Sequence, residues 1–206
     1  MTFDELLEWT NSTAYSEPES EHHNAICIQM MRWMDRALYP PRSGLTIDIG
    51  SGSGVVLNIL GGMGFTGLIG TNLLDEDADS CVRNGICCWQ EDMHRIASSS
   101  WRGLWKRASL VTARHILEHS PAPALVLRTI WSLVPEGCGL YVEVPAPGTA
   151  ARHEYNPNHW SVLSRTGWAA LIEKCGFEIV DQTIITLTIP AGEDAYYAYA
   201  ARKMKS

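Results

Sequence analysis

The stretch "IDIGSGSGVV", residues 47–56, decides the predicted fold. It begins in the apolar segment 45–50, typical of a buried strand, and passes through three alternate glycines into an apolar helix expected over about 53–61. Gly50 permits a tight turn, Gly52 lets the backbone approach a ligand closely, and Gly54 lets the helix pack near the sheet. Because the first N–H groups of such a helix are free, the turn predicts a ligand site.

The residues around the glycines restrict the class of ligand. A dinucleotide fingerprint requires a glycine where Val55 stands, and a phosphate loop requires a lysine followed by Ser or Thr, which is missing nearby. Asp48 instead places a carboxylate at the end of the strand. A carboxylate suits a cation, such as the α-amino group of an amino-acid moiety, better than it suits a pyrophosphate. A tight turn without a ligand is the alternative, but alternate glycines cost conformational entropy.

Strands and helices are expected to alternate outward from this stretch. The strands are predicted at 45–50, 66–72, 86–92, 108–113, 140–145, 177–189 and 194–203, and helices at 3–10, 21–38, 53–61, 75–85, 122–134 and 164–176. Repeated strand–helix units imply a parallel sheet covered on both faces, with ligands beyond the carboxyl ends of its strands. The predicted fold is therefore α/β and Rossmann-like, a doubly wound, mostly parallel seven-stranded sheet that ends in an antiparallel hairpin.

Composition indicates the class of partner. The chain has 206 residues, 46% of them hydrophobic, which suits one domain with a full core. A net charge of −7 argues against nucleic-acid binding through bulk charge, so small molecules or other proteins are expected as partners instead. The six cysteines form no CxxC pair, no apolar run is long enough for a membrane, and the N-terminus does not resemble a signal peptide. We therefore expect a cytoplasmic protein, a monomer or a homodimer, without a membrane or nucleic-acid partner.

Four segments, in order, resemble class I S-adenosylmethionine-dependent methyltransferases of the type 11/23 kind. They are "IDIGSGSG" (47–54), "QEDMHRI" (90–96), "ASLVTARHILEHSPAPALVLRTIWSLVPEGCGLYVEVP" (108–145) and "GWAALIEKCGFEIV" (167–180). The glycine motif alone is moderately specific, whereas the ordered set is strong. The resemblance implies a methyltransferase domain over 44–206 and the cofactor S-adenosylmethionine, with S-adenosylhomocysteine as product. It also implies an N-terminal helical lid over 1–43, with Tyr15 and Trp33 as contacts; packing in the core is the alternative for Trp33.

The resemblance also implies the cofactor-binding residues. Asp48 would face the methionine amino group, and Asp92 and Met93 would lie by the adenine. Asn72 stands where the family usually has Asp or Glu for the ribose hydroxyls; an amide can accept from one and donate to the other but lacks charge, and Asp75 is the alternative. The full predicted set is Asp48, Gly50, Ser51, Gly52, Gly54, Asn72, Leu73, Asp92, Met93 and Arg114.

Histidines are the candidate catalytic residues. Methyl transfer is an in-line displacement, so the protein mainly aligns the acceptor and excludes water, and a histidine can take the proton of a hydroxyl or amine. His115 and His119 follow the fourth strand, and His159 lies in the loop after the fifth. His119 has the alternative role of packing or capping the next helix. No metal site is predicted, because "SEPESEHH" (16–23) has charge but no defined ligand spacing.

The predicted function is transfer of a methyl group from S-adenosylmethionine to a small-molecule or glycan acceptor, at oxygen. A non-catalytic S-adenosylmethionine-binding scaffold or regulatory protein, and a methyltransferase that acts on proteins, remain alternatives. The residues after the fourth strand are "ARHI" (113–116), without the Asn-Pro-Pro-Tyr-like motif of amino-group nucleic-acid methylases.

Overall fold

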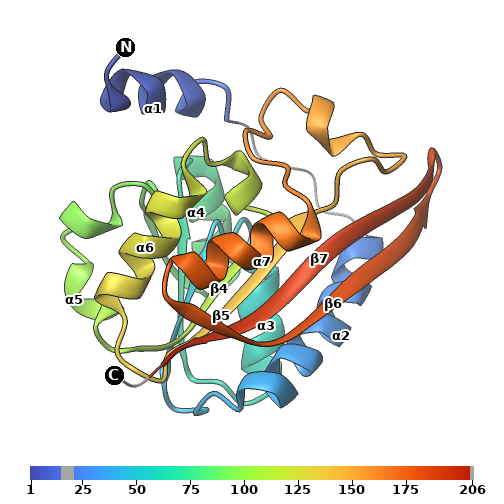
Figure 1. Ribbon diagram of the computed structural model, residues 1–206. Helices are drawn as coiled ribbons and strands as arrows, with labels where there is room; N and C mark the ends of the chain where they lie inside the picture. Colours follow the sequence, from blue (N-terminus) through green and yellow to red (C-terminus); the bar gives the residue numbers. More distant parts are fainter. Residues whose placement is uncertain (15–20, 205–206) are drawn as a thin grey trace.

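The computed structural model describes residues 1–14 and 21–204, with side chains from residue 25 onward in the second range (Figure 1). Tyr15 and most of the segment 16–23 lie outside the described residues, and so do the side chains of His22 and His23. The lid contact expected of Tyr15 is therefore not described, nor are the side chains of that acidic segment.

The seven strands form one sheet in the order β3-β2-β1-β4-β5-β7-β6. All neighbours are parallel except β7, which runs antiparallel to both β5 and β6. The predicted doubly wound sheet with a terminal antiparallel hairpin is confirmed. The strands are β1 (Leu45–Ile49), β2 (Gly67–Asn72), β3 (Cys87–Gln90), β4 (Ala108–Arg114), β5 (Gly139–Pro145), β6 (Phe177–Ile189) and β7 (Gly192–Lys203).

Helices cover both faces of the sheet, with α2 and α3 on one side and α6 and α7 on the other (Figure 1). The α-helices are α1 (Phe3–Asn11), α2 (Glu21–Leu38), α3 (Val55–Gly62), α4 (Asp75–Arg83), α5 (Arg102–Trp105), α6 (Pro123–Leu133) and α7 (Arg165–Lys174). Three short 3-10 turns, η1 (Ile96–Ser98), η2 (Leu117–His119) and η3 (His153–Tyr155), lie in loops. The second of these turns carries the candidate His119, and the third carries His153, which lines the cavity described below.

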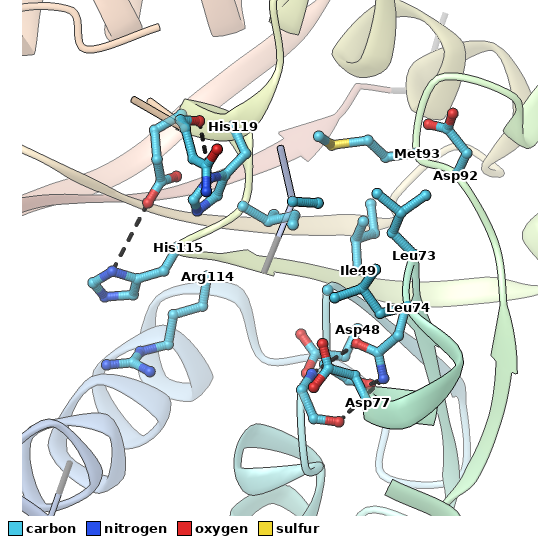
Figure 2. A pocket seen from close by; sticks show the side chains of 18 of the residues that line it. Asp48, Ile49, Leu73, Leu74, Asp77, Asp92, Met93, Arg114, His115 and His119 are labelled. Atoms are coloured by element: carbon cyan, nitrogen blue, oxygen red, sulfur yellow. Dashed lines mark hydrogen bonds and ion pairs between the residues drawn. The ribbon is translucent and has the colours of Figure 1, made fainter. Parts of the chain in front are cut away.

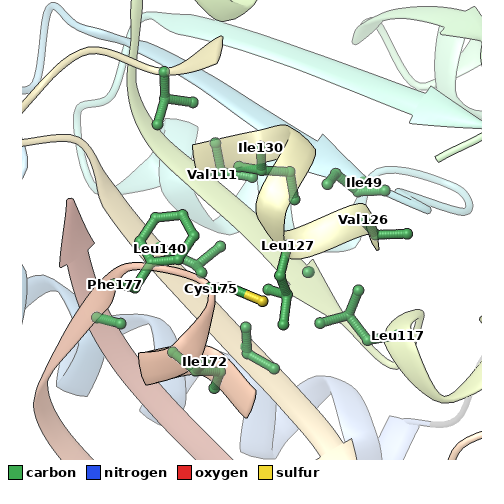
Figure 3. Packing of buried hydrophobic residues seen from close by; sticks show 14 of the residues in the cluster. Ile49, Val111, Leu117, Val126, Leu127, Ile130, Leu140, Ile172, Cys175 and Phe177 are labelled. Atoms are coloured by element: carbon green, nitrogen blue, oxygen red, sulfur yellow. The ribbon is translucent and has the colours of Figure 1, made fainter. Parts of the chain in front are cut away.

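The larger apolar core lies under α6 and α7 (Figure 3). The α6 side chains Val126, Leu127 and Ile130 are fully buried and belong to one cluster with Val111 of β4 and Leu140 of β5. Each such side chain contributes about 1.5–3 kcal/mol of transfer free energy. This packing holds β4 and β5, whose carboxyl ends carry the candidate catalytic side chains.

The N-terminal segment divides into two parts with different packing. Helix α2 belongs to the core of the opposite face, where Met31 and Met34 are fully buried and Trp33 packs against Tyr141 with ring centroids 6.4 Å apart. Helix α1 instead lies beyond the carboxyl ends of the strands (Figure 1). The lid predicted for residues 1–43 remains a prediction, and α1 is the part of it that is placed to act as one.

Candidate active site

A cavity of about 740 Å³ opens at the carboxyl ends of β1, β2 and β4. This is the position where open α/β sheets bind ligands, at the switch between β1 and β4. Figure 2 shows Asp48 and Asp77 at one end, Asp92 and Met93 along one wall, and His115 and His119 at the other end. The cavity brings together every predicted site residue except Gly54: Asp48, Gly50, Ser51, Gly52, Asn72, Leu73, Asp92, Met93, Arg114, His115, His119 and His159.

The glycine loop has the backbone conformation that its sequence indicates. Gly50, Gly52 and Gly54 all have positive φ angles, of 66°, 52° and 93°. A Cβ on Gly50 would lie 2.5 Å from the side chain of Ile116, whereas a Cβ on Gly52 would meet nothing within 4 Å. Gly52 is therefore the position where a ligand can approach the bare backbone. Gly54 faces the side chains of Cys81 and Ile86, and its lack of a Cβ makes room for the α4 layer rather than for the cavity.

Asn72 is bonded to the glycine loop itself. Its Oδ1 accepts from the backbone N–H of Gly52 at 2.8 Å, and its Nδ2 lies 3.1 Å from Gly52 O and 3.2 Å from Ser51 Oγ. The side chain is buried although it borders the cavity. The ribose contact predicted for Asn72 remains a prediction, and these hydrogen bonds join its amide to the glycine loop.

Asp48 is a buried carboxylate at the floor of the cavity. Only 2% of the residue is exposed, and its Oδ1 accepts a hydrogen bond from Thr112 Oγ1 at 2.6 Å. Burial raises the pKa of Asp48 to about 7, against the opposing effect of the Thr112 bond. A cation bound beside Asp48 would favour the ionised carboxylate, because it offsets the cost of burying a negative charge.

Asp92 is fixed from two sides. His94 donates to Oδ1 through its backbone N–H at 2.9 Å and through Nδ1 at 2.8 Å, and Asn11 of α1 donates to Oδ2 at 3.0 Å. Burial opposes ionisation, but these hydrogen bonds lower the pKa of Asp92. The carboxylate is therefore a preformed acceptor, and one of its donors comes from the N-terminal helix.

Acidic side chains of α4 border the cavity beyond β2. Glu76 and Asp77 line it, whereas Asp75, the alternative ribose ligand from the sequence, does not. The three residues form the first turn of α4, and successive positions on a helix face different directions. Glu76 and Asp77 thus replace Asp75 as the acidic candidates there.

Arg114 and His115 share one buried partner. Arg114 Nε lies 2.9 Å and His115 Nε2 lies 2.8 Å from Glu143 Oε1, and Tyr141 donates its hydroxyl to Oε2 of the same carboxylate. Burial alone would raise the pKa of Glu143, but the charge of Arg114 and these donors hold it at about 2. Glu143 is 1% exposed, so it acts beneath the cavity and positions two residues that line it.

His115 also has a strained backbone. Its φ is +53°, in the left-handed region that residues other than glycine rarely adopt. Its N–H donates to Glu143 O at 2.9 Å, and its ring lies 4.5 Å from that of Tyr196. Such strain persists only where many surrounding contacts hold the residue in that conformation, and it is common at functional sites.

His119 and His159 face each other across the cavity end, with ring centroids 4.9 Å apart. His119 Nδ1 lies 3.1 Å from Asn158 O, and His159 Nδ1 lies 3.0 Å from His153 O. Burial lowers the pKa of His119, which keeps its imidazole neutral near pH 7. The structure therefore places these two candidate histidines at the same end of the cavity.

Several cavity residues were not predicted as site residues, among them Glu118, Asn11, Asp77 and Tyr196. Glu118 adjoins His119 in "LEH", and its position beside a candidate histidine was the available signal. Asn11, Asp77 and Tyr196 come from α1, α4 and β7, and no local pattern connects them with the glycine loop.

The described residues fit S-adenosylmethionine. Asp48 would hold its ammonium group, the open backbone of Gly52 leaves space for its amino-acid and ribose part, and Leu73 and Met93 offer apolar contact for the adenine beside Asp92. When bound, this cofactor supplies an activated methyl group on a sulfonium sulfur.

Comparison with known proteins agrees with this fit. Residues 19–182 match the family model of a methyltransferase domain. No curated protein sequence matches the chain. Among the solved structures that share the fold is a SAM-dependent methyltransferase from Archaeoglobus fulgidus, with 15% identity and a TM-score of 0.68 over 98% of this chain and 100% of that one. A second, from Methanosarcina mazei, has 14% identity and a TM-score of 0.65 over 82% of this chain and 96% of that one. A third, magnesium protoporphyrin IX methyltransferase from Synechocystis with bound SAH, has 13% identity and a TM-score of 0.63 over 97% of this chain and 95% of that one.

Among the described residues, no helix is long and apolar enough to cross a membrane. The matched family segment covers most of the chain and contains the glycine loop, Asp92 and the histidines that follow β4. The chain thus belongs to the methyltransferase domain family of class I S-adenosylmethionine-dependent methyltransferases, enzymes that transfer the methyl group of this cofactor and release S-adenosylhomocysteine.

Proposed function

We propose that this methyltransferase acts on a hydroxyl oxygen of a small-molecule or glycan acceptor. The observation that carries the proposal is the lining of the cavity beyond Arg114. That end is built from imidazole and aromatic side chains, namely His115, His119, His153, His159, Trp160 and Tyr196. Imidazoles exchange hydrogen bonds with hydroxyl groups, and a tryptophan offers a flat apolar face to a sugar or aromatic ring.

The charge of this end disfavours an anionic acceptor. Arg114 lines it, but the buried carboxylate of Glu143 compensates that positive charge at 2.9 Å, and a second carboxylate, that of Glu118, also lines this end. The net charge of the chain is −7, so an anionic polymer is disfavoured. An uncharged polyhydroxylated or phenolic compound suits such a wall best.

Each part of the cofactor is bound by a different set of residues. Asp48 binds the ammonium group, Gly50, Ser51 and Gly52 lie against the amino-acid and ribose part, and Asp92 with Leu73 and Met93 binds the adenine. Asn72 keeps the loop open, and Glu76 or Asp77 accepts from the ribose hydroxyls. The donor methyl group then faces His115, and α1 excludes water from above through its bond from Asn11 to Asp92.

The roles of the histidines follow from their contacts. His115 is bonded to Glu143 and orients the acceptor at the boundary between the two halves of the cavity. His119 and His159 form the acceptor side of the site, and they are the residues that favour loss of the proton from the acceptor oxygen. The displacement itself needs alignment more than it needs a strong base.

Transfer of a radioactive methyl group from S-adenosylmethionine tests the proposal. The acceptor panel contains sugars, catechols and phenols, with primary amines and a mixture of denatured proteins as controls for the two alternatives. We expect methylation of a hydroxyl compound, a loss of at least tenfold in kcat/KM in His159→Ala, and loss of cofactor binding in Asp48→Ala. Cofactor binding without transfer to any acceptor would favour a scaffold, and transfer to protein alone would favour a protein methyltransferase.

A further inference from the structure

Glu118, His119 and His159 bring three potential metal ligands together at the acceptor end of the cavity. Each offers one ligand atom, and these atoms lie within 4.8 Å of one another. Bonds of about 2.1 Å to an ion place ligand atoms about 3 to 4 Å apart, so a movement of about an ångström closes the set. Glu118 and His119 lie on η2, and His159 lies in the loop after β5.

The hydrogen bonds of both imidazoles select the tautomer that a metal requires. Nδ1 of His119 faces Asn158 O at 3.1 Å, and Nδ1 of His159 faces His153 O at 3.0 Å. A carbonyl oxygen only accepts, so each Nδ1 carries the proton and each Nε2 keeps its lone pair. Metal-binding histidines commonly have this arrangement, in which a backbone carbonyl fixes the ring from behind.

The two segments that carry the ligands are joined to each other. Ser161 donates its backbone N–H to Glu118 O at 2.9 Å and its hydroxyl to Ser120 O at 2.7 Å, on either side of the bond from His119 to Asn158. The loop after β5 is thereby held against η2. A site on such a frame is prearranged, although its ligands lie about forty residues apart in the sequence.

The buried negative charge of Glu118 also favours a cation bound between these residues. The residue is 1% exposed, and burying a carboxylate is costly unless positive charge compensates it. His115 Nδ1 lies 3.9 Å from Glu118 Oε1, beyond a short ion pair. A dication bound to the same carboxylate would compensate its charge more strongly.

A contact of His159 must change when an ion enters. Asn156 Nδ2 lies 3.3 Å from His159 Nε2, the atom that would bind the metal. This bond is long, and the same amide also accepts through Oδ1 from Asn158 N at 3.0 Å, which can persist when Nδ2 turns away. At this contact, entry of the ion breaks a weak hydrogen bond.

We propose that Glu118, His119 and His159 bind a divalent transition-metal ion, Zn²⁺ or Mn²⁺, that holds the acceptor hydroxyl. Two imidazoles and one carboxylate suit these ions better than Mg²⁺ or Ca²⁺, and three protein ligands leave positions open for a substrate. This role in catalysis rests on the proposed function, whereas the binding of the ion does not.

The reaction at this site is balanced without a further reactant. The hydroxyl bound to the metal gives its proton to water, since the ion lowers its pKa. An oxygen lone pair then forms the new bond to the methyl carbon while the carbon–sulfur bond breaks. The electron pair of that bond remains on sulfur, which becomes the neutral thioether of S-adenosylhomocysteine.

Calorimetric titration of the chelator-treated full chain with MnCl₂ and with ZnCl₂ tests the site. We expect one ion per chain, and binding at least tenfold weaker in His159→Ala and in the nearly isosteric Glu118→Gln. Glu178→Gln is the matched control for Glu118→Gln, because it removes the same charge at an exposed position of β6 and should bind the ion as the unaltered chain does. The same proteins are heated with and without Mn²⁺, and the ion should raise Tm only where the three ligands are intact.

The outcomes separate the site from the proposed function. Absence of ion binding by the unaltered chain, or equal binding by Glu118→Gln, would overturn the metal site even if methyl transfer is found. Ion binding that depends on the three ligands supports the site even if no acceptor is found. If the chelator-treated enzyme methylates its acceptor at the full rate, the ion does not hold the hydroxyl, and that part of the proposal is overturned. S-adenosylhomocysteine binding by Glu118→Gln verifies that the cofactor half is intact.

Discussion

The carboxamide of Asn72 and the backbone of Gly52 form two hydrogen bonds, with Asn72 Oδ1 2.8 Å from Gly52 N and Nδ2 3.1 Å from Gly52 O. One side chain thereby satisfies both polar groups of the residue whose bare backbone faces the cavity. A carboxylate at position 72 could accept from Gly52 N but could not donate to Gly52 O. The asparagine therefore suits this loop in a way that the acidic residue usual in the family would not.

Replacement of Asn72 tests this arrangement. Asn72→Asp should lower the free energy of unfolding by about 1–3 kcal/mol, because it removes donors to Gly52 O and Ser51 Oγ in a buried place. Urea unfolding measures the change. Asn84→Ala is the control, since Asn84 Nδ2 donates to Ser53 O at 2.9 Å from an exposed position and its loss should cost less than about 1 kcal/mol. Equal losses in the two variants would contradict the special role of Asn72.

The pH dependence of cofactor binding should follow Asp48. Burial raises the pKa of Asp48 to about 7, so the carboxylate is protonated at lower pH and no longer attracts an ammonium group. Affinity for S-adenosylhomocysteine should therefore rise about fivefold to tenfold between about pH 6 and pH 7.5. Calorimetry at several pH values measures it.

Two controls isolate the contribution of Asp48 to that rise. Methylthioadenosine lacks the amino-acid part, so its affinity should change little over the same range. Asp48→Asn should bind S-adenosylhomocysteine weakly and without the rise. A rise of equal size for both ligands would show that another group is titrating.

The part of the cavity lining that the sequence predicted depends on the order of strands and helices along the chain. The glycine turn, its place between β1 and α3, and the carboxyl ends of β2 and β4 follow from strand–helix alternation, since parallel strands bring their carboxyl ends to one edge. Asp48, Asn72 and His115 lie at those ends, and the cavity forms there. These residues could be predicted because each stands next to a strand that the apolar pattern identifies.

The remainder depends on contacts that no local pattern encodes. Glu143 alternates with apolar neighbours in β5, and only the fold shows that it meets Arg114 and His115 beneath the cavity. Tyr196 reaches the cavity from β7 because the terminal hairpin pairs with β5. Gly54 has the spacing of a ligand-binding glycine, yet the side chains it faces are those of Cys81 and Ile86.

Removal of the charge of Glu143 should destabilise the protein. Glu143→Gln leaves Arg114 largely buried without its counter-ion, and breaking a buried pair costs about 3–5 kcal/mol. The pKa of Glu143 is lowered to about 2, so its contribution is present above the ordinary value of 4.5 and is lost as pH falls toward 2. Urea unfolding at pH 7 and at acid pH should show a difference between the variant and the unaltered protein that shrinks on acidification.

The exposed Glu178 of β6 provides the control for this substitution. Glu178→Gln removes the same charge at a solvated position, so its unfolding free energy should stay within about 0.5 kcal/mol of the unaltered protein. A loss as small in Glu143→Gln would mean that the pair contributes no net stability.

Substitutions in helix α1 should alter the affinity for the cofactor more than the stability of the protein. Asn11 donates to Asp92 at 3.0 Å, and the ring of Trp9 packs on that of Trp160 at 4.7 Å between centroids, so the helix joins the adenine side to the acceptor loop. Asn11→Ala should weaken S-adenosylhomocysteine binding by about threefold to tenfold, as expected for one hydrogen bond to a charged group, with Tm little changed.

Hydrogen exchange provides the second measurement on α1. Since Trp9 is half exposed and the helix has few buried side chains, its amides should exchange rapidly in the free protein and slow down when S-adenosylhomocysteine is bound. Glu8→Ala, on the exposed face of the same helix, is the control and should leave affinity and exchange unchanged. If the exchange of residues 3–11 does not respond to the ligand, α1 is not a lid, and the weaker binding of Asn11→Ala would reflect only the lost donor to Asp92.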